Sequence, residues 1–293
     1  MVFFNDLLFS LESDVDNYAD DTTITSTAKS VDEIGNKLTS DCKKISDWMK
    51  SNLLKLNPDK THVMTLGTAE RLRTLTSKVK VTMDDVQLEE SPQQAELLLG
   101  CHIQANLKWN TQVEMLLSKL RKRITGLMKI RVVGTFNLRK TITEGIFNSV
   151  LVYCLPLFGG MGVGFVRQLQ IMQNKAARIV TSMPPVASRS SMFDKLKWLS
   201  INQLVFYHSV ILVYKIRKSN EPEHLASILG ADSRNNRIII PNMDLRVAQE
   251  SFTIRAANYW NLLPHTIRTQ SKISQFKKHA KSWILEKVDQ FLD

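Results

Sequence analysis

The sequence has few cysteines, and they are far apart. Cys42, Cys101 and Cys154 are three in number and widely spaced, so they form neither a disulfide framework nor a zinc ligand set. The six histidines likewise show no HxxxH pattern. These absences argue against a disulfide-rich secreted protein and a zinc finger. They favour a reducing compartment, the cytoplasm or the nucleus.

Long hydrophobic segments are also scarce. Residues 1–11 are apolar, but they lack a basic n-region and contain two polar interruptions, so they do not indicate a signal peptide. The uncharged stretch 145–166 is long enough to span a membrane. Its Asn148, Pro156 and glycine cluster instead favour a buried helix that ends in a glycine-rich loop. We therefore expect no membrane partner.

Negative charge is scarce in one part of the chain only. Residues 1–100 hold 11 Lys and Arg against 17 Asp and Glu, a net charge of −6, whereas residues 101–293 hold 28 against 11, a net charge of +17. A basic segment attracts nucleic acid through phosphate contacts and counterion release, although a solvated surface gives the same count. The length of 293 residues allows one large or two ordinary domains.

Two adjacent aspartates stand near the start of the chain, in the string YADD at residues 18–21. Neighbouring carboxylates repel each other, so a buried pair is normally stabilised by a divalent cation such as Mg²⁺, which also binds substrate phosphates. An exposed turn can carry the same dipeptide, as we expect for Asp84-Asp85 between two strand-like segments. The four-residue string is rarer than the dipeptide, and its neighbours decide its meaning.

Residues 1–105 show mixed helix and strand patterns. We expect a hairpin with the Asp pair at its tip and a β-rich return strand, then a helix over 30–51 that begins with a capping box of Ser30 and Glu33. A turn at 57–59 and four strand-like segments follow, at 61–66, 78–82, 86–88 and 95–103, the last one interrupted by Gly100.

The pattern becomes helical after residue 104. Asn110 and Asn137 are candidate caps for two helices, the first over 110–131. Further helices are expected at 165–182, 201–218, 244–262 and 272–291, with loops at 184–185 and 219–236. We expect Trp260 and Trp283 in the core.

The helix over 110–131 has an apolar stripe and many basic residues around the rest of its circumference. Phosphate contact and an ordinary solvated face are equally good interpretations of this pattern. The basic residues are Lys119, Arg121, Lys122, Arg123, Lys129 and Arg131.

The order of these segments resembles the reverse transcriptases of non-LTR retrotransposons, of the jockey-like or CR1-like kind. The resemblance covers essentially the whole chain and is carried by FFNDLLFS, YADDTTI, DWMKSNLLKLNPDKTHVM, LGCHIQANLKW, LQIMQNKAARIV, DKLKWLSI and AANYWNLLPHTIR. It implies an α+β fold with a partial polymerase palm (1–105), a thumb-like helical region (106–183) and a basic helical C-terminal extension (184–293). It also implies an RNA template, a DNA primer and dNTP as partners.

The resemblance assigns roles to individual residues. Asp20 matches the metal-ligating Asp of the family, and Asp21 is its neighbouring ligand or electrostatic partner. Such polymerases use two Mg²⁺ ions to activate the primer 3′-hydroxyl and to stabilise the leaving pyrophosphate. Tyr18 and Ala19 match residues that lie under the primer end.

Three further matches concern catalysis and nucleic acid. Lys60 matches a lysine proposed to protonate the pyrophosphate, although a surface turn lysine explains it nearly as well. Leu99 and Gly100 match a turn that positions the primer. The basic helix 110–131 would contact the backbone of the duplex.

Two departures from the family pattern limit the expected activity. The family has another catalytic Asp on an earlier strand and a PQG stretch after it, and this sequence starts beyond both. Polar Asp14, Asp16 and Asn17 stand where the family's strand is usually apolar. We therefore expect weak Mg²⁺ binding and no polymerisation by this chain alone. A non-catalytic nucleic-acid-binding protein and a retrotransposon relic without function stay open as alternatives.

Overall fold

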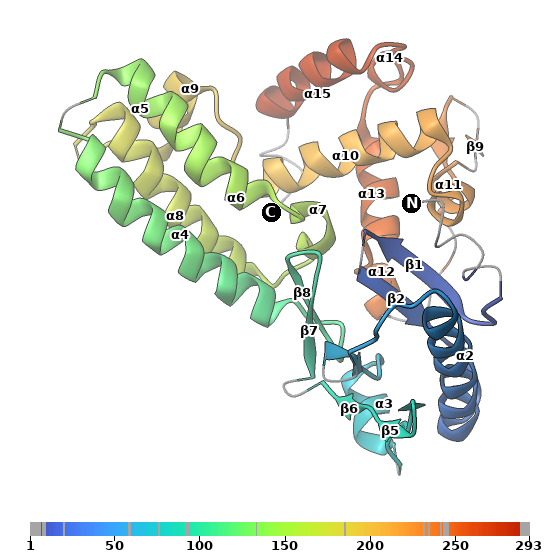
Figure 1. The fold of residues 1–293 in the computed structure, drawn as a ribbon. Coiled ribbons are helices and arrows are strands. Elements are labelled where there is room, and N and C mark those ends of the chain that lie inside the picture. Colours follow the sequence, from blue (N-terminus) through green and yellow to red (C-terminus); the bar gives the residue numbers. More distant parts are fainter. Residues whose placement is uncertain are drawn as a thin grey trace. The chain divides into compact units, whose positions relative to one another are not determined.

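The computed structural model divides into two compact units, Met1–Lys108 and Trp109–Asp293 (Figure 1). It describes residues 7, 10–19, 21–57, 60–75, 77–91, 94–132, 134–184, 186–230, 232, 233, 235–240, 242 and 246–287. The first unit combines helices with short strands and the second is mostly helical, so the fold is of the mixed α+β class, as expected.

The first unit contains ten short or medium elements, counted over the described residues. They are β1 (Asp14–Tyr18), β2 (Asp21–Thr25), α2 (Val31–Ser51), β3 (His62–Val63), α3 (Ala69–Thr74), β4 (Thr82–Met83), β5 (Val86–Gln87), β6 (Glu89–Glu90), β7 (Ala95–Leu98) and β8 (Cys101–Gln104). Three pairs are antiparallel hairpins, β1–β2, β4–β5 and β7–β8, and β3 pairs with β6 in parallel.

Helix α2 is the longest element of the first unit, and the prediction of a helix over 30–51 is confirmed. The Ser30 side chain accepts the Glu33 N–H at its start, which satisfies one of the free N–H groups of the first turn. The buried Cys42 packs in a small core with Val81 and Met83. Gly35 allows a close approach, because a Cβ there would lie 2.7 Å from the Lys80 carbonyl oxygen.

The strands of the first unit are shorter than the sequence patterns indicated. The predicted strand over 61–66 is reduced to β3, and most of 78–82 lies outside a strand. The interruption expected at Gly100 within 95–103 is confirmed: Leu99 and Gly100 have φ values of 47° and 79°, and this left-handed pair turns the chain from β7 into β8. The expected turn at Asp84-Asp85 is confirmed between β4 and β5.

The second unit is built from helices with one small strand pair. Its described elements are α4 (Asn110–Ile130), α5 (Phe136–Thr143), the π-helical segment η3 (Glu144–Asn148), α6 (Ser149–Val152), α7 (Leu155–Phe158), α8 (Val163–Thr181), α9 (Arg189–Leu196), α10 (Ile201–Ser219), α11 (Glu223–Leu229), β9 (Asp232–Ser233), β10 (Arg237–Ile238), α12 (Arg246–Gln249), α13 (Phe252–Leu262), α14 (His265–Arg268) and α15 (Ile273–Lys287).

Two apolar cores hold this second unit together. In the first, α4 lies along α8, with α5, η3, α6 and α9 around them (Figure 1). In the second, α10 packs against α13 and α15, and the aromatic side chains of Trp260 and Phe276 stack at 5.8 Å between ring centroids. Trp260 is buried and Trp283 is partly buried, so the core placement expected for both is confirmed.

Helix positions in the second unit follow the apolar periodicity, but two predicted caps are wrong. Asn110 is the first helical residue and follows the N-cap Trp109. Thr135, not Asn137, caps α5 by accepting the Leu138 N–H. The helices expected at 165–182 and 201–218 are confirmed as α8 and α10.

The predicted helix boundaries fail where the chain breaks locally. The stretch 145–166 is interrupted, since Cys154 adopts a left-handed φ of 54° between α6 and α7. The expected loop 219–236 contains α11 and β9, and the helix expected over 244–262 is divided into α12 and α13. The last expected helix corresponds to α15, and residues 288–293 lie outside the described part of the chain.

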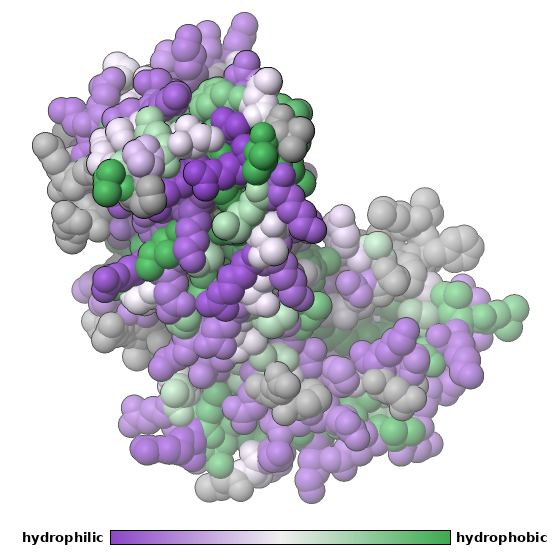
Figure 2. Space-filling model, turned by 90° about the vertical axis from the view of Figure 1, so that its left-hand side faces the viewer, coloured by the Kyte–Doolittle hydropathy of each residue, from purple (hydrophilic) through white to green (hydrophobic). Residues whose placement is uncertain are grey.

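Hydrophobic side chains are distributed between the interior and small surface groups. Within the described residues, one stretch, Arg189–Ser219, is long and apolar enough to cross a membrane by composition, and 56% of its most apolar window is buried inside the fold. The face drawn in Figure 2 carries hydrophilic side chains interspersed with small groups of hydrophobic ones. Single exposed apolar residues of this kind are normal on protein surfaces.

Candidate nucleic-acid interface

The YADD string lies at the end of the β1–β2 hairpin. Tyr18 pairs with Asp21 across the hairpin, so the connection between the strands holds Ala19 and Asp20. Ala19 has a left-handed φ of 57°, and the Tyr18 side chain is 68% exposed. Asp20 itself lies outside the described residues. The expected hairpin is therefore confirmed, and Tyr18, Ala19 and Asp21 lie exposed at its tip.

Asp41 of α2 holds the chain at the point where it enters this hairpin. Its carboxylate is fully buried and accepts the Glu12 and Ser13 N–H groups, each at 3.0 Å. Lys44 Nζ lies 3.5 Å from Asp41 Oδ1 and 2.9 Å from Glu12 Oε1. Burial alone would raise the pKa of Asp41, but these hydrogen bonds and the Lys44 charge outweigh it and lower the pKa.

Sequence reasoning missed Asp41, although a signal was present. Leu38, Asp41 and Ile45 follow one another at the spacing of a single helix face. An acidic residue on an apolar stripe has to be neutralised by hydrogen bonds or an opposite charge. The position therefore indicates a buried, partnered carboxylate, and the structure assigns it to the support of the hairpin.

Asp84-Asp85 differs from the YADD pair in its partners. The Asp84 carboxylate accepts hydrogen bonds from Ser46 and from Lys50, whose Nζ lies 2.6 Å away. Lys50 and then Ser46 lower the pKa of Asp84. Both aspartates adopt left-handed φ values, of 51° and 64°, which suits a tight hairpin turn. This pair is a structural turn whose charge is partly compensated.

Metal ligands at the hairpin tip can be assessed only for the described residues. Across the part of the chain that the structure describes, no three His, Cys, Asp or Glu side chains gather in a way that could hold a metal ion. Asp21 contributes one exposed carboxylate at the tip. Coordination of Mg²⁺ by Asp20 and Asp21 therefore stays a prediction.

The other residues matched in the first unit lie on separate elements. Lys60 is exposed and follows Asn57, whose carbonyl accepts its N–H at 3.1 Å. Leu99 and Gly100 form the exposed turn between β7 and β8. Their proposed contacts with pyrophosphate and primer stay predictions.

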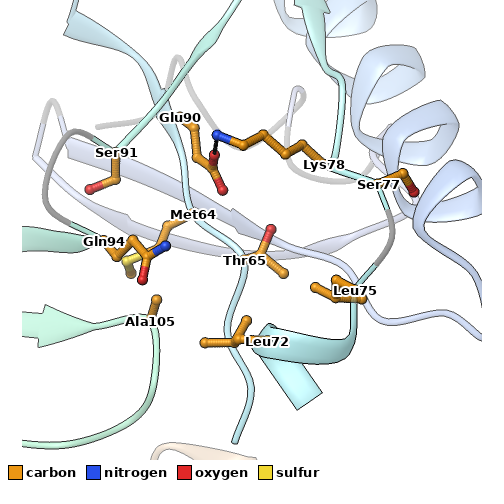
Figure 3. A pocket seen from close by; sticks show the side chains of 10 residues that line it. All are labelled: Met64, Thr65, Leu72, Leu75, Ser77, Lys78, Glu90, Ser91, Gln94 and Ala105. Carbon is orange, nitrogen blue, oxygen red and sulfur yellow. Dashed lines mark ion pairs between the residues drawn. The ribbon is translucent and has the colours of Figure 1, made fainter. Parts of the chain in front are cut away.

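A cavity of about 330 Å³ also lies in the first unit, beside α3 (Figure 3). Lys78 reaches across it to Glu90, with 2.6 Å between Nζ and Oε2, and Leu72 and Leu75 line the other side. The positive and negative charges in this lining thus neutralise each other. The cavity contains no pair of a nucleophile and a base that would indicate catalysis.

Helix α4 carries the basic residues singled out in the sequence. Its apolar stripe, which includes Leu116, Leu120 and Leu127, is buried. Lys122 and Lys129 are seven residues apart and thus on one side of the helix, roughly opposite this stripe. All six predicted contact residues, Lys119, Arg121, Lys122, Arg123, Lys129 and Arg131, are exposed.

The basic residues of α4 are accompanied by a single acidic residue on their own helix. Glu114 is the only acidic residue within Asn110–Ile130. No ion pair among the described residues involves any of the six. By contrast, Arg139 of α5 is used inside the fold, since its Nε donates to the Val180 carbonyl at 3.1 Å. The helix thus presents positive charge that a polyanion could neutralise.

Two separate candidate elements result, an acidic hairpin tip in the first unit and a basic helix in the second. Each is exposed, and neither has a counter-ion among the described residues. A comparison of the chain with models of known protein families, with characterised proteins and with solved structures found no match.

Proposed function

We propose that the chain is part of an RNA-directed DNA polymerase of a non-LTR mobile element, in which it contributes the YADD hairpin and a nucleic-acid-binding helical region. The observation that carries this proposal is the β1–β2 hairpin with residues 19 and 20 at its two-residue tip. Two-metal nucleotidyl transfer requires carboxylates close together, and we propose that Asp20 and Asp21 supply two of them. The linked sequence segments that resemble this family support the same assignment.

The surroundings of the hairpin support a role within a larger sheet. Among the described residues, β1 and β2 pair only with each other. A two-stranded hairpin is marginally stable by itself, and its open edges offer N–H and C=O groups for further strands. We propose that the palm strand carrying the third catalytic carboxylate pairs here, and that this chain alone does not polymerise.

Helix α4 supports the nucleic-acid part of the proposal. Its exposed lysines and arginines have no ion-pair partners in the described structure. Phosphate contacts by such residues release counterions, so affinity falls as salt rises. We propose that α4 lies against the backbone of a primer–template duplex.

Catalysis is tested by primer extension on an RNA template with Mg²⁺ and dNTP. We expect no template-directed synthesis by this chain. Robust synthesis that Asp20→Asn abolishes would overturn the claim of inactivity.

The coding frame upstream of the Met1 codon gives a second test: an open frame encoding an Asp-bearing strand and a PQG stretch supports the polymerase assignment, whereas stop codons favour a relic.

Nucleic-acid binding is tested by a salt titration with a labelled RNA–DNA duplex. For the double variant Lys122→Gln/Lys129→Gln we expect weaker binding and a slope of log K against log salt that is shallower by about 2, since each lost phosphate contact is worth about 0.9. The matched control, Lys37→Gln/Lys43→Gln on α2, removes the same charge and should leave the slope unchanged. Equal slopes for both variants would argue against α4.

A second candidate function is nucleic-acid binding without turnover. The net charge of +17 over residues 101–293 favours it independently of the YADD string. The same titration separates the two proposals from a protein without such a function, because binding that is insensitive to ionic strength contradicts phosphate contact in both.

A further inference from the structure

A second cavity, of about 170 Å³, lies within the second unit beside the π-helical segment η3. It is lined by residues from η3, α6, α8, α10 and α15 and from the segment that precedes α10. The chemically informative ones are Glu144, Asn148, Trp198, Tyr207 and Lys281. This cavity combines aromatic, amide and charged side chains in one small volume.

The π-helical segment sets the arrangement of this lining. It extends over Glu144–Asn148, and both of its terminal residues line the cavity. Glu144 Oε1 accepts the Trp198 indole N–H at 2.9 Å, which fixes the carboxylate and the ring relative to each other. Short π-helical insertions in helices recur at functional sites.

Asn148 provides an unsatisfied polar group at the cavity. Its Oδ1 is buried and has no hydrogen-bond partner among the described residues. A buried oxygen in this state is unfavourable, and a ligand that brings an N–H group would satisfy it. An amide offers a donor and an acceptor side by side, which matches the edge of a nucleobase.

The charged lining favours an anionic ligand. Lys281 of α15 and the exposed Lys197 both line the cavity, against the single carboxylate of Glu144. Burial lowers the pKa of Lys281, Glu144 opposes this effect, and Lys140 adds to it. With two lysines against one carboxylate, the positive charge is in excess, as phosphate binding requires.

The aromatic lining favours a ring beside the phosphate. Trp198 is buried, and Tyr207 is partly buried on α10. Unpaired bases stack on such side chains. A volume of about 170 Å³ is well below the roughly 300 Å³ of the smallest drug-sized pockets. It therefore suits one ring system and excludes a duplex.

We propose that this cavity binds one unpaired nucleotide, with its base beside Tyr207 and Asn148 and its phosphate at Lys197 and Lys281. The inference rests on the proposed nucleic-acid binding and adds a base-dependent component to it. Helix α4 supplies salt-dependent contacts to phosphates, whereas the cavity distinguishes a strand with bases from one without them.

The test compares a labelled single-stranded decanucleotide with a fully abasic strand of the same length. Both carry the same phosphates, so a preference for the intact strand measures contacts to the bases. We expect the wild-type chain to prefer it about tenfold, as one stacked base allows. Equal, salt-dependent binding of both strands would overturn the cavity proposal and leave the function of α4 intact. Failure to bind either strand would overturn both.

Single substitutions test which residues cause the preference for the intact strand. Tyr207→Ala should reduce the preference to less than about threefold without changing affinity for the abasic strand, and Tyr207→Phe, which keeps the ring, should retain the preference. Asn148→Leu removes the unsatisfied oxygen at similar volume, so it should fold as well as the wild type and still lose preference. A Tyr207→Ala variant that folds and keeps the full preference would contradict the proposal.

A matched pair of lysine variants tests the phosphate contact, and a free nucleotide tests what fills the cavity. Lys281→Gln should weaken binding of the intact strand several-fold, whereas Lys278→Gln, at an exposed position on the same helix, should have the small effect of one charge. Equal effects of the two variants would argue against a phosphate at Lys281. Saturable binding of AMP that Tyr207→Ala abolishes would show that a free nucleotide fills the cavity. If the chain prefers the intact strand but does not bind AMP, the cavity binds a nucleotide that is part of a strand.

Discussion

The two units are stabilised in different ways. Five of the six ion pairs among the described residues lie in the first unit, which has a small apolar core around Cys42. The second unit has two large apolar cores and a single ion pair, Lys140–Glu144. Its basic residues far outnumber its acidic ones, so most of its positive charge remains for solvent or for a polyanion. The difference indicates that charge contributes to folding in the first unit, whereas most of the charge of the second unit is left for solvent or for the polyanion proposed above.

The comparison predicts that apolar truncation is most damaging in the second unit. Trp260 is 1% exposed, stacks on Phe276, lies under Arg217 at 5.4 Å, and donates its indole N–H to the Asn236 carbonyl at 2.9 Å. Trp260→Ala should destabilise this unit by about 3–5 kcal/mol, through lost burial and the cavity that remains. Denaturant unfolding and hydrogen exchange over residues 109–287 measure the loss.

Trp48 of α2 is the matched control for Trp260. It is only partly buried, so Trp48→Ala should cost the first unit about 1–2 kcal/mol, since the cost scales with the area buried. A cost for Trp48→Ala equal to that for Trp260→Ala would remove the contrast between the two units.

Asp41 should be the most sensitive charged position of the first unit. In Asp41→Asn the side chain keeps one oxygen, so one of the Glu12 and Ser13 N–H groups loses its acceptor. We expect a loss of about 1–3 kcal/mol, the cost of an unsatisfied buried donor. Asp47→Asn changes an exposed aspartate of the same helix and should have little effect. Equal melting temperatures for both variants would contradict this role of Asp41.

The pH dependence of Asp41 has a definite sign. The pKa of this carboxyl is lowered in the folded chain, so its stabilising contribution is complete above the unfolded value of about 3.9 and is lost as pH falls further. The wild type should therefore lose its advantage over Asp41→Asn below about pH 4. Acid titration of both proteins, followed by circular dichroism, measures this convergence. A constant difference down to pH 2 would contradict it.

Helices were predictable wherever an apolar stripe of several turns decides the structure. The predictions over 30–51, 110–131 and 201–218 hold because burial of one face outweighs local propensity there. Local backbone conformation was not predictable in the same way. Gly100 marked the interruption of 95–103 but not the left-handed φ of Leu99, and the sequence of η3, which includes Gly145, did not indicate a π-helical segment.

The candidate site was predictable in part. The β-rich return strand located the hairpin, and helical spacing located the exposed lysines of α4. The support by Asp41 and the cavity beside η3 depend on contacts between segments 28 to more than 130 residues apart, such as Ser13 with Asp41 and Glu144 with Lys281. A pattern read along the chain does not report such contacts, because it describes one element at a time.

The smallest expected effect concerns the Asp84-Asp85 turn, and it has the opposite sign. Asp85 has a φ of 64°, a conformation that is unfavourable for most side chains and readily adopted by glycine. Asp85→Gly creates an Asp-Gly turn and keeps the hydrogen bond from Lys50 to Asp84. Glycine also has greater freedom in the unfolded chain, which offsets part of the gain. We therefore expect the free energy of unfolding of the first unit to rise by about 0.5 kcal/mol. Asp85→Ala removes the same charge without this freedom and should lower stability. Thermal unfolding of the two variants separates backbone strain from charge, because a charge effect alone would shift both in the same direction.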